Sequence, residues 1–479
     1  MADPAPIVRP VGGTEHSWCR AVPGGTGTTV LALSVSAPPD LAHLEKALQW
    51  IQASRPILRS RIRFDPTTAA FSFVVLPSPY VKIVSFGVDE TSQILNGVPE
   101  AERSDLSPFH LILEHEMNVN PWRDFQTSVT EDGEPGDDIE VFFASVYSLS
   151  EGKRVLTLRL HTGACDRATA AALLRDLLRL VSGGGGGGGA ELVCEEGSTT
   201  QVSSAIEDLI PSGKANKPFW ARGVDLLGYS LNSFRFSNLD FVDAAGERRS
   251  QVLRLTLEAE DTQRLLQECE SQGVKLCAVL AAAALIAAHL SKQLPDQQWQ
   301  KYAVVTLVDC RTLLEPPLPK QHPGFYHSAI MNTHDLNGGE KLWDLARRTH
   351  GAFSGAKERN KHFSDMGDLN FLMCRALDNP GLTHSGSLRT ALISVFEDVV
   401  IEESSPSHGD IGLQDYIGCA SVHGIGPSIA IFDTIRDGRI DSACVYPHPL
   451  HTREQMRGLM DRMKAVLTGD DGDGGDDVD

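Results

Sequence analysis

A short segment, His161–Asp166 (HTGACD), brings an imidazole, a thiol and a carboxylate within six residues. These are the groups of nucleophilic and acid–base chemistry. The segment follows an apolar run at 154–161 and precedes an amphipathic one at 167–181, so it joins a predicted strand to a predicted helix. Cys165 beside His161 is a candidate nucleophile. Asp166 stands where a helix N-cap is expected.

Each of these residues also has an ordinary structural interpretation. A single cysteine in an apolar segment is more often inert packing than a nucleophile, and we favour packing for Cys165. Cys444, His448 and His451 have spacings that could suit a metal ion. Prolines on both sides of His448 favour a plain loop instead, so we predict no metal site.

Common catalytic signatures are missing from the sequence. It contains no GxSxG, HExxH or GxxxxGK[ST] motif, which disfavours the common hydrolase, zincin and P-loop classes. The glycine groups at 24–27 and 424–426 are isolated and carry little information alone.

The elements that must position these residues form two α/β halves. In the first half, strands are predicted at 28–36, 58–64, 71–76, 141–147 and 154–161, with helices from Leu41 and over 167–181. In the second half, strands are predicted at 250–257, 302–308 and 389–396 and in a hairpin of 428–435 with 440–446 around Asp437-Gly438. Helices are predicted at 261–271, 274–290, 341–357 and 452–467.

Composition suggests where these halves divide. Seven glycines, Gly183–Gly189, have no side chains to bury and favour a flexible link. We therefore predict an N-terminal domain at 1–182, a Gly-rich and acidic linker at 183–217, a C-terminal domain at 218–467 and a disordered acidic tail at 468–479.

The charge and cysteine content narrow the function classes. The formal net charge of −20 disfavours nucleic-acid binding. Nine scattered cysteines without a CxxC pair favour a reducing compartment. The apolar stretch 276–290 is too short for a membrane span, and the Pro- and Gly-containing N-terminus is unlike a signal peptide. We expect a soluble, cytoplasmic protein.

The segment HTGACD resembles the HHxxxDG motif of the acyl-CoA-dependent acyltransferase and condensation-domain superfamily. In this register His161 matches the first His, Thr162 the second, Asp166 the Asp and Arg167 the Gly. Further pieces occur in the family's order: 54–62 (SRPILRSRI) resembles its "RHPxLRTRI" strand, 309–311 (DCR) its "DLR", and 446–455 its "Y…FSREQ". Residues 13–16 lie where these proteins begin their first strand. The DFGWG signature is missing, which favours the condensation-domain and alcohol-acetyltransferase-like branches.

The resemblance implies a fold and a reaction. The fold is α/β (α+β), with two chloramphenicol-acetyltransferase-like domains, each a mixed sheet flanked by helices, and a tunnel between them. The reaction moves an acyl group from a CoA or carrier thioester to a small hydroxyl or amine acceptor, in a monomer with acyl-CoA as co-substrate and no bound cofactor. The family's Asp orients the motif through an ion pair with the "DLR" arginine, here Asp166 and Arg311.

Position 162 divides the two functional hypotheses. The family's general base is the second His, and a threonine hydroxyl has no pKa near 7. His161 is the nearest imidazole, although strand alternation points it to the other face. The first hypothesis is therefore an acyltransferase, and the alternative is a catalytically inactive relative that binds a ligand or a protein partner.

Overall fold

The computed structural model describes residues 5–103, 105–125, 138–182, 202–217, 236–292, 298–403 and 409–469. The chain forms two compact units that interleave along the sequence. Unit 1 consists of 1–213, 310–327 and 404–424, and unit 2 of 214–309, 328–403 and 425–479. Segments 310–327 and 404–424, which the sequence placed in the C-terminal domain, thus belong to unit 1. The Gly tract and the tail beyond 469 lie outside the described residues, so their flexibility stays a prediction.

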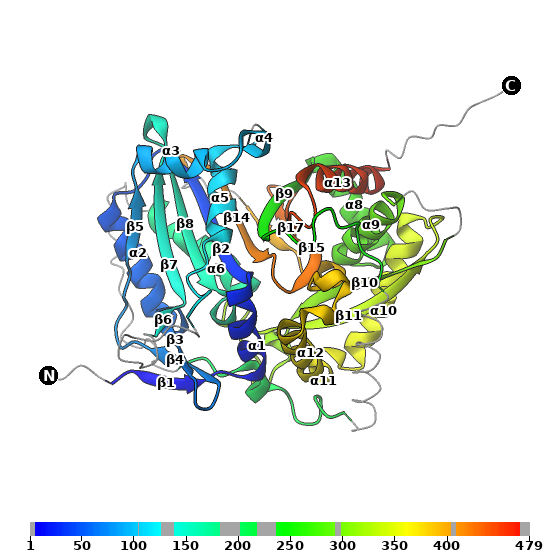
Figure 1. Ribbon diagram of the computed structural model, residues 1–479, viewed down its shortest axis with the longest axis horizontal. Helices are drawn as coiled ribbons and strands as arrows, with labels where there is room; N and C mark the ends of the chain where they lie inside the picture. The colour runs from blue at the N-terminus through cyan, green and yellow to red at the C-terminus, as the bar shows by residue number, and fades with distance from the viewer. Residues whose placement is uncertain are drawn as a thin grey trace. The chain divides into compact units, whose positions relative to one another are not determined.

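The main sheet of unit 1 carries the HTGACD segment. Its strand order is β14 (Leu413–Val422), β2 (Thr26–Val35), β8 (Arg154–His161), β7 (Phe142–Ser148) and β5 (Ile83–Phe86). Neighbours are antiparallel except β5 and β7, which are parallel. Strands β14 and β2 lie side by side (Figure 1), although they come from opposite ends of the chain.

Helices cover this sheet because each presents an apolar stripe. Helix α2 (Leu41–Ser54) is capped by Asp40, whose carboxylate accepts a hydrogen bond from the His43 amide at 2.7 Å. It packs against α6 (Arg167–Ser182), and the buried residues between them include Leu48 and Leu177. Unit 1 also contains α3 (Val88–Asn96), α4 (Glu100–Arg103) and α5 (Pro108–Asn118), together with helix α1 (Gly13–Ala21).

Two predictions for the N-terminal part of unit 1 are wrong, one in a second sheet and one in the helix that follows its first strand. The strand order of this sheet is β1 (Ile7–Pro10), β4 (Ala70–Val75), β3 (Ser60–Asp65) and β6 (Ile139–Glu140). The strand predicted from 58 begins only at Ser60, because 56–59 forms a 3-10 turn that buries Arg59 against the carbonyls of Leu76 and Gln52. Residues 13–16 do not begin a strand but open helix α1 (Gly13–Ala21), because Glu15 accepts a hydrogen bond from the Gly12 amide at 2.8 Å.

Unit 2 contains an eight-stranded mixed sheet, ordered β11-β10-β12-β15-β17-β16-β13, with β9 paired to β17. Strands β10, β12 and β15 are parallel, whereas β17 is antiparallel to β15, β16 and β9. The strand bounds are β9 Arg249–Leu257, β10 Gln300–Asp309, β11 His327–Leu336, β12 Arg389–Phe396, β13 Val400–Glu402, β15 Gly426–Phe432, β16 Thr434–Arg436 and β17 Arg439–His448. Asp437 and Gly438 both have positive φ in the tight β16–β17 turn, at the place the sequence predicted.

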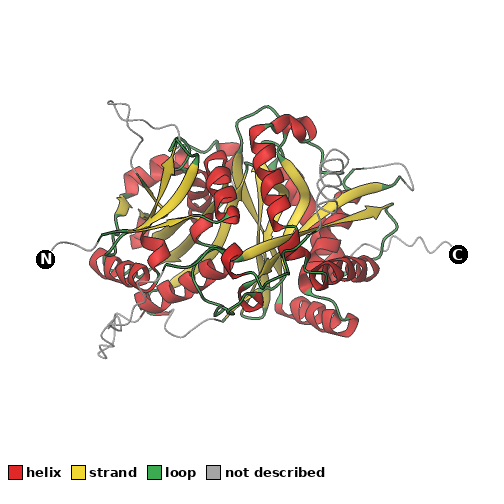
Figure 2. Ribbon diagram, turned by 90° about the horizontal axis from the view of Figure 1, so that it is seen from below, coloured by secondary structure: helices red, strands yellow, loops and turns green. Residues whose placement is uncertain are grey.

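Helices flank the strands of this sheet (Figure 2). Their bounds are α8 Ala259–Gln272, α9 Leu276–Leu290, α10 Leu342–Glu358, α11 Lys361–Ser364, α12 Met366–Asp378 and α13 Arg453–Thr468. Helix α9 is apolar on nearly all sides and is therefore buried against α10, α13 and β12. Among the described helices none is long and apolar enough to cross a membrane alone; α8 and α9 meet that test only as a pair bent by 105°.

Candidate functional site

The turn after β8 places the predicted site residues at one edge of the unit 1 sheet. His161 ends β8, residues 162–164 form a 3-10 turn, and α6 begins at Arg167. The His161 side chain is buried, and its Nδ1 accepts a hydrogen bond from the Gly163 amide at 3.1 Å. Its ring packs edge-on against Trp122, with centroids 5.3 Å apart. Burial lowers the pKa of His161 to about 3, so the ring is neutral and poorly suited to accept a proton at neutral pH.

Thr162 lies on the other side of the turn. Its hydroxyl is 2.9 Å from that of Thr29 on β2, and both side chains are buried. Gly27, also on β2, has a φ of +96°, and a Cβ there would lie 3.2 Å from the Thr162 Cβ. The threonine therefore packs directly over the β2 backbone, with its hydroxyl engaged by a neighbour that is not a base.

Asp166 and Arg311 are brought together in one buried ion pair. Arg311 Nη1 lies 2.9 Å from Asp166 Oδ2, and Nη2 donates to Oδ1 at 2.9 Å. The two side chains are 0% and 1% exposed. Asp166 Oδ1 also accepts from the Thr169 amide at 2.9 Å, so the same carboxylate caps α6. The sequence left open whether Asp166 is an N-cap or part of an ion pair, and in the structure it is both.

Two further groups donate hydrogen bonds to the carboxylate of Asp166. The Tyr326 amide donates to Oδ2 at 2.8 Å, and His327 Nδ1 lies 2.9 Å from the same oxygen. Since a carboxylate only accepts, Nδ1 of His327 carries the proton. Burial alone would raise the pKa of Asp166, but the charge of Arg311 and the bonds from His327 and Arg311 hold it well below the usual value. The carboxylate is therefore ionised and fixed, and cannot shuttle protons.

His327 is the residue of this cluster that sequence reasoning missed. The chain has 16 histidines, and no local pattern distinguishes this one. Only the return of 310–327 to unit 1 brings it to Asp166. Cys165, in contrast, behaves as packing: it is fully buried, and burial together with the charge of Asp166 raises the pKa of its thiol.

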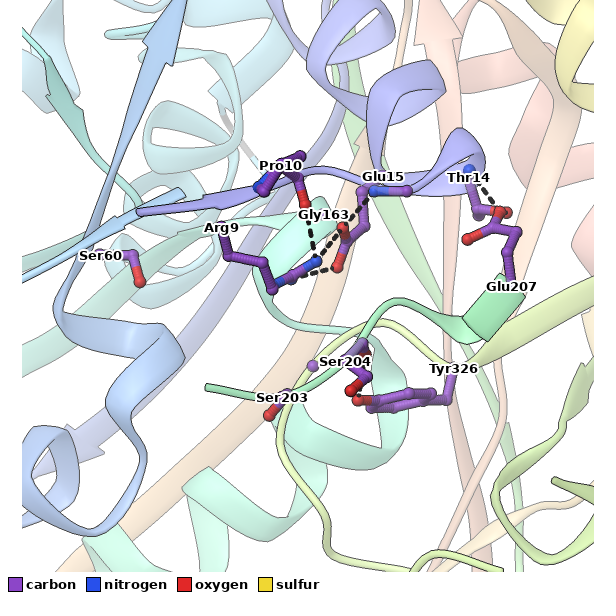
Figure 3. Close-up of polar contacts among 12 residues, drawn as sticks. Arg9, Pro10, Thr14, Glu15, Ser60, Gly163, Ser203, Ser204, Glu207 and Tyr326 are labelled. Atoms are coloured by element: carbon purple, nitrogen blue, oxygen red, sulfur yellow. Dashed lines mark hydrogen bonds and ion pairs between the residues drawn. The ribbon is translucent and has the colours of Figure 1, made fainter. Parts of the chain in front are cut away.

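Helix α1 is tied beside the turn by polar contacts (Figure 3). Arg9 pairs with Glu15 at 2.7 Å, and Glu207 accepts from the amide of Thr14 at 2.7 Å. These bonds hold α1 in place, and its Trp18 packs against Phe325, with ring centroids 5.4 Å apart. The wall beside the turn is therefore aromatic.

Three strand ends meet at this edge of the sheet. Thr28 of β2 lies opposite His161 of β8, and Thr26 lies opposite Val422 of β14. The Ser421 hydroxyl, on β14, accepts from the Thr28 amide at 3.0 Å. The end of β14 is therefore separated from the turn after β8 by one strand.

The arrangement brings together His161, Thr162, Asp166 and Arg311, all within unit 1. It provides an ionised, immobile carboxylate, a neutral imidazole and a hydroxyl. Among the described residues no group of three histidine, cysteine or acidic side chains is placed to hold a metal ion.

The burial of His161 predicts a pH-dependent stability. In the unfolded chain His161 titrates near pH 6.5, but in the fold its pKa is about 3, so the unfolded state binds more protons as the pH falls between these values. Between pH 7 and pH 5 the wild type should lose about 2 kcal/mol of unfolding free energy that His161→Asn does not lose. Urea denaturation of both proteins at pH 7, 6 and 5 measures this difference, and parallel pH dependences would contradict it.

Comparison with known proteins identifies one matching family model and several structures of the same fold. The family model described as the C-terminus of phthiocerol/phthiodiolone dimycocerosyl transferase matches residues 246–355. No curated protein sequence matches the chain. The structure is similar to the trichothecene 15-O-acetyltransferase TRI3 of Fusarium sporotrichioides, with a TM-score of 0.67 and 12% identity over 97% of this chain and 95% of that chain.

Two other similar structures are a condensation domain and an X-domain. The first condensation domain of the calcium-dependent antibiotic synthetase, in complex with a substrate analogue, has a TM-score of 0.59 and 14% identity over 96% of both chains. The X-domain of teicoplanin biosynthesis, in complex with OxyB, has a TM-score of 0.55 and 17% identity over 98% of this chain and 96% of that chain.

The chain therefore has the fold shared by acyltransferases and condensation domains, with two chloramphenicol-acetyltransferase-like domains. The fold class and the superfamily resemblance inferred from the sequence are confirmed at this level.

Proposed function

We propose that this protein is an acyltransferase that moves an acyl group from a CoA or carrier thioester to a hydroxyl or amine acceptor. The observation that carries the proposal is the buried Asp166–Arg311 pair at the start of α6. A fully buried ion pair is costly to maintain, because both charges lose their hydration. The fold is shared with TRI3. The presence of this ion pair at the motif position therefore supports a site whose geometry is maintained.

The proposed reaction needs no resident cofactor. The acyl thioester is a co-substrate, and the acceptor oxygen or nitrogen attacks its carbonyl carbon. The chain must orient the acceptor, exclude water and take one proton. The 162–166 turn would be held rigid by Asp166 and Arg311, while Trp18 and Phe325 would supply an apolar wall.

A specific observation favours a second candidate, a catalytically inactive binding protein. Neither group at the motif can act as a base near pH 7, since Thr162 is a hydroxyl and burial lowers the pKa of His161 to about 3. The X-domain shows that a protein of this fold can form a complex with a protein partner.

Thiol release separates the two candidates. Purified protein with acetyl-, malonyl- and longer acyl-CoA donors and a panel of alcohols and amines should release CoA faster than the same reaction without acceptor. Calorimetric titration with CoA, run in parallel, reports binding alone. CoA binding without turnover over the whole panel would contradict the acyltransferase proposal and favour the binding protein, more so if Thr162→His then creates turnover.

A further inference from the structure

A second histidine lies at the same sheet edge as Thr162. His423 directly follows β14 and is 7% exposed. Strand β14 runs antiparallel to β2 with Val422 opposite Thr26, so His423 lies beside Gly25. The sequence offered no sign of this placement, because the two residues are almost 400 positions apart.

The glycines before and on β2 make room for this imidazole. Gly25 has a φ of +97°, and a Cβ built on it would lie 2.0 Å from Nε2 of His423. Nε2 therefore occupies the space of the missing side chain. Gly424 is also in close contact with the backbone before β2, since a Cβ on Gly424 would lie 2.4 Å from the Gly24 carbonyl oxygen. The two isolated glycine groups of the sequence thus pack against each other, which fixes His423 on the β2 backbone.

Two glycines close together in the sequence relate the position of His423 to that of Thr162. Thr162 packs over Gly27, where a Cβ would lie 3.2 Å from its own. Gly25 and Gly27 are two residues apart, so their Cα atoms are at most about 7 Å apart. His423 Nε2 and the Thr162 side chain therefore lie against two glycines that are close in space, one just before β2 and one at its second position.

We propose that His423 is the general base of the acyl transfer and takes over the role that position 162 has lost. This inference rests on the proposed function. A ring nitrogen of His423 accepts the proton of the acceptor hydroxyl. At the same time the oxygen of that hydroxyl forms a bond to the carbonyl carbon of the thioester. The carbon–sulfur bond then breaks, and the proton passes from the imidazolium to the leaving thiolate, so that ester and free thiol are the products.

The two histidines at the Asp166 end of β8, His161 and His327, are less suited to this role. His161 has its Nδ1 occupied and its pKa lowered to about 3 by burial. His327 donates to Asp166, whose oxygens are already shared with Arg311 and two backbone amides. His423 differs from both in its position, since it lies against Gly25, two residues before the glycine over which Thr162 packs.

The test compares kinetics of variants in the full-length protein, using the donor and acceptor pair on which the wild type is active. His423→Gln should lower kcat at least about 100-fold with little change in KM, since general-base catalysis contributes this much. His423→Gly should be as slow, and added imidazole should restore part of its rate, which a purely structural role would not allow. His115→Gln, which alters a half-buried histidine on α5, serves as the matched control and should retain the wild-type rate.

The outcomes are distinguishable. An active wild type with unaffected His423→Gln and folded variants would overturn His423 as the base and leave the proposed function standing. If only His327→Gln loses activity, His423 is likewise overturned as the base, the proposed function stands, and His327 beside Asp166 becomes the candidate. A wild type inactive on every substrate that still binds CoA would overturn the proposed function, and His423 as base with it.

Discussion

Asp166→Asn and Arg311→Ala, combined in one protein, should destabilise it by clearly less than the sum of their separate effects. Each single substitution leaves a buried charge without its counter-charge and should cost about 3–5 kcal/mol of unfolding free energy. Asn at 166 can still cap α6, so loss of the cap is a minor part of this cost. With both charges removed, we expect a coupling energy of about 2 kcal/mol in denaturant unfolding of the four proteins.

A matched cycle on the surface provides the control. Asp261 and Arg264 are three residues apart on α8, pair at 2.7 Å and are 31% and 60% exposed. Their coupling should stay below about 0.5 kcal/mol. A coupling at 166 and 311 no larger than at this pair would show that Asp166 acts on stability as a cap alone.

The same pair has a pH signature. The pKa of Asp166 is lower in the fold than in the unfolded chain, so its stabilising effect is complete above about pH 4, where the unfolded group is also ionised. As the pH falls below that value, the unfolded state takes up a proton that the fold excludes. The difference in stability between wild type and Asp166→Asn should therefore shrink with acidification.

Thr162→His should restore turnover of the His423→Gln protein by about 100-fold or more, on the premise of the proposed acyltransferase activity. The Thr162 backbone is fixed by the 3-10 turn and by β8, and its Cβ lies over Gly27, two residues from the glycine that the His423 ring contacts. An imidazole added there would supply a base at the place where the family resemblance puts one. Steady-state thiol release of both variants with the same donor and acceptor measures the gain.

Thr162→Asn in the same background is the matched control, since its amide is polar but does not take up a proton near pH 7. Both variants lose the bond to Thr29, a cost of about 1 kcal/mol. A folded Thr162→His protein that is as slow as Thr162→Asn would show that the base must act from the β14 side of the edge.

The sequence predicted the regular elements well where one local rule dominates. The helix from Leu41, the apolar stripe of 167–181 and the turn at 437–438 each depend on neighbours within a few residues. Strand β14 escaped prediction because its burial depends on β2 and not on its own alternation of polar and apolar residues. The turn at 56–59 was missed because the buried Arg59 is stabilised by carbonyls that the pattern does not show.

Part of the candidate site was also predictable from the sequence, and part was not. The Asp166–Arg311 contact was expected from a resemblance, and the structure brings the two residues together. His327 and His423 could not be found from the sequence, because each reaches the site on a segment that leaves the second half of the chain and enters unit 1. Such placements are set by topology, which one sequence without its fold does not specify.

Strand β14 also has a consequence for biosynthesis. Residues 1–403 contain β2, β8, β7 and β5 but not the strand that covers the outer edge of β2. Until 413–422 has left the ribosome, β2 is an edge strand with an unpaired row of amides and carbonyls, ready to pair with another chain. Unit 1 therefore completes its sheet only after residue 422 has been translated, and until then the exposed edge of β2 in the nascent chain is a site where another chain can pair.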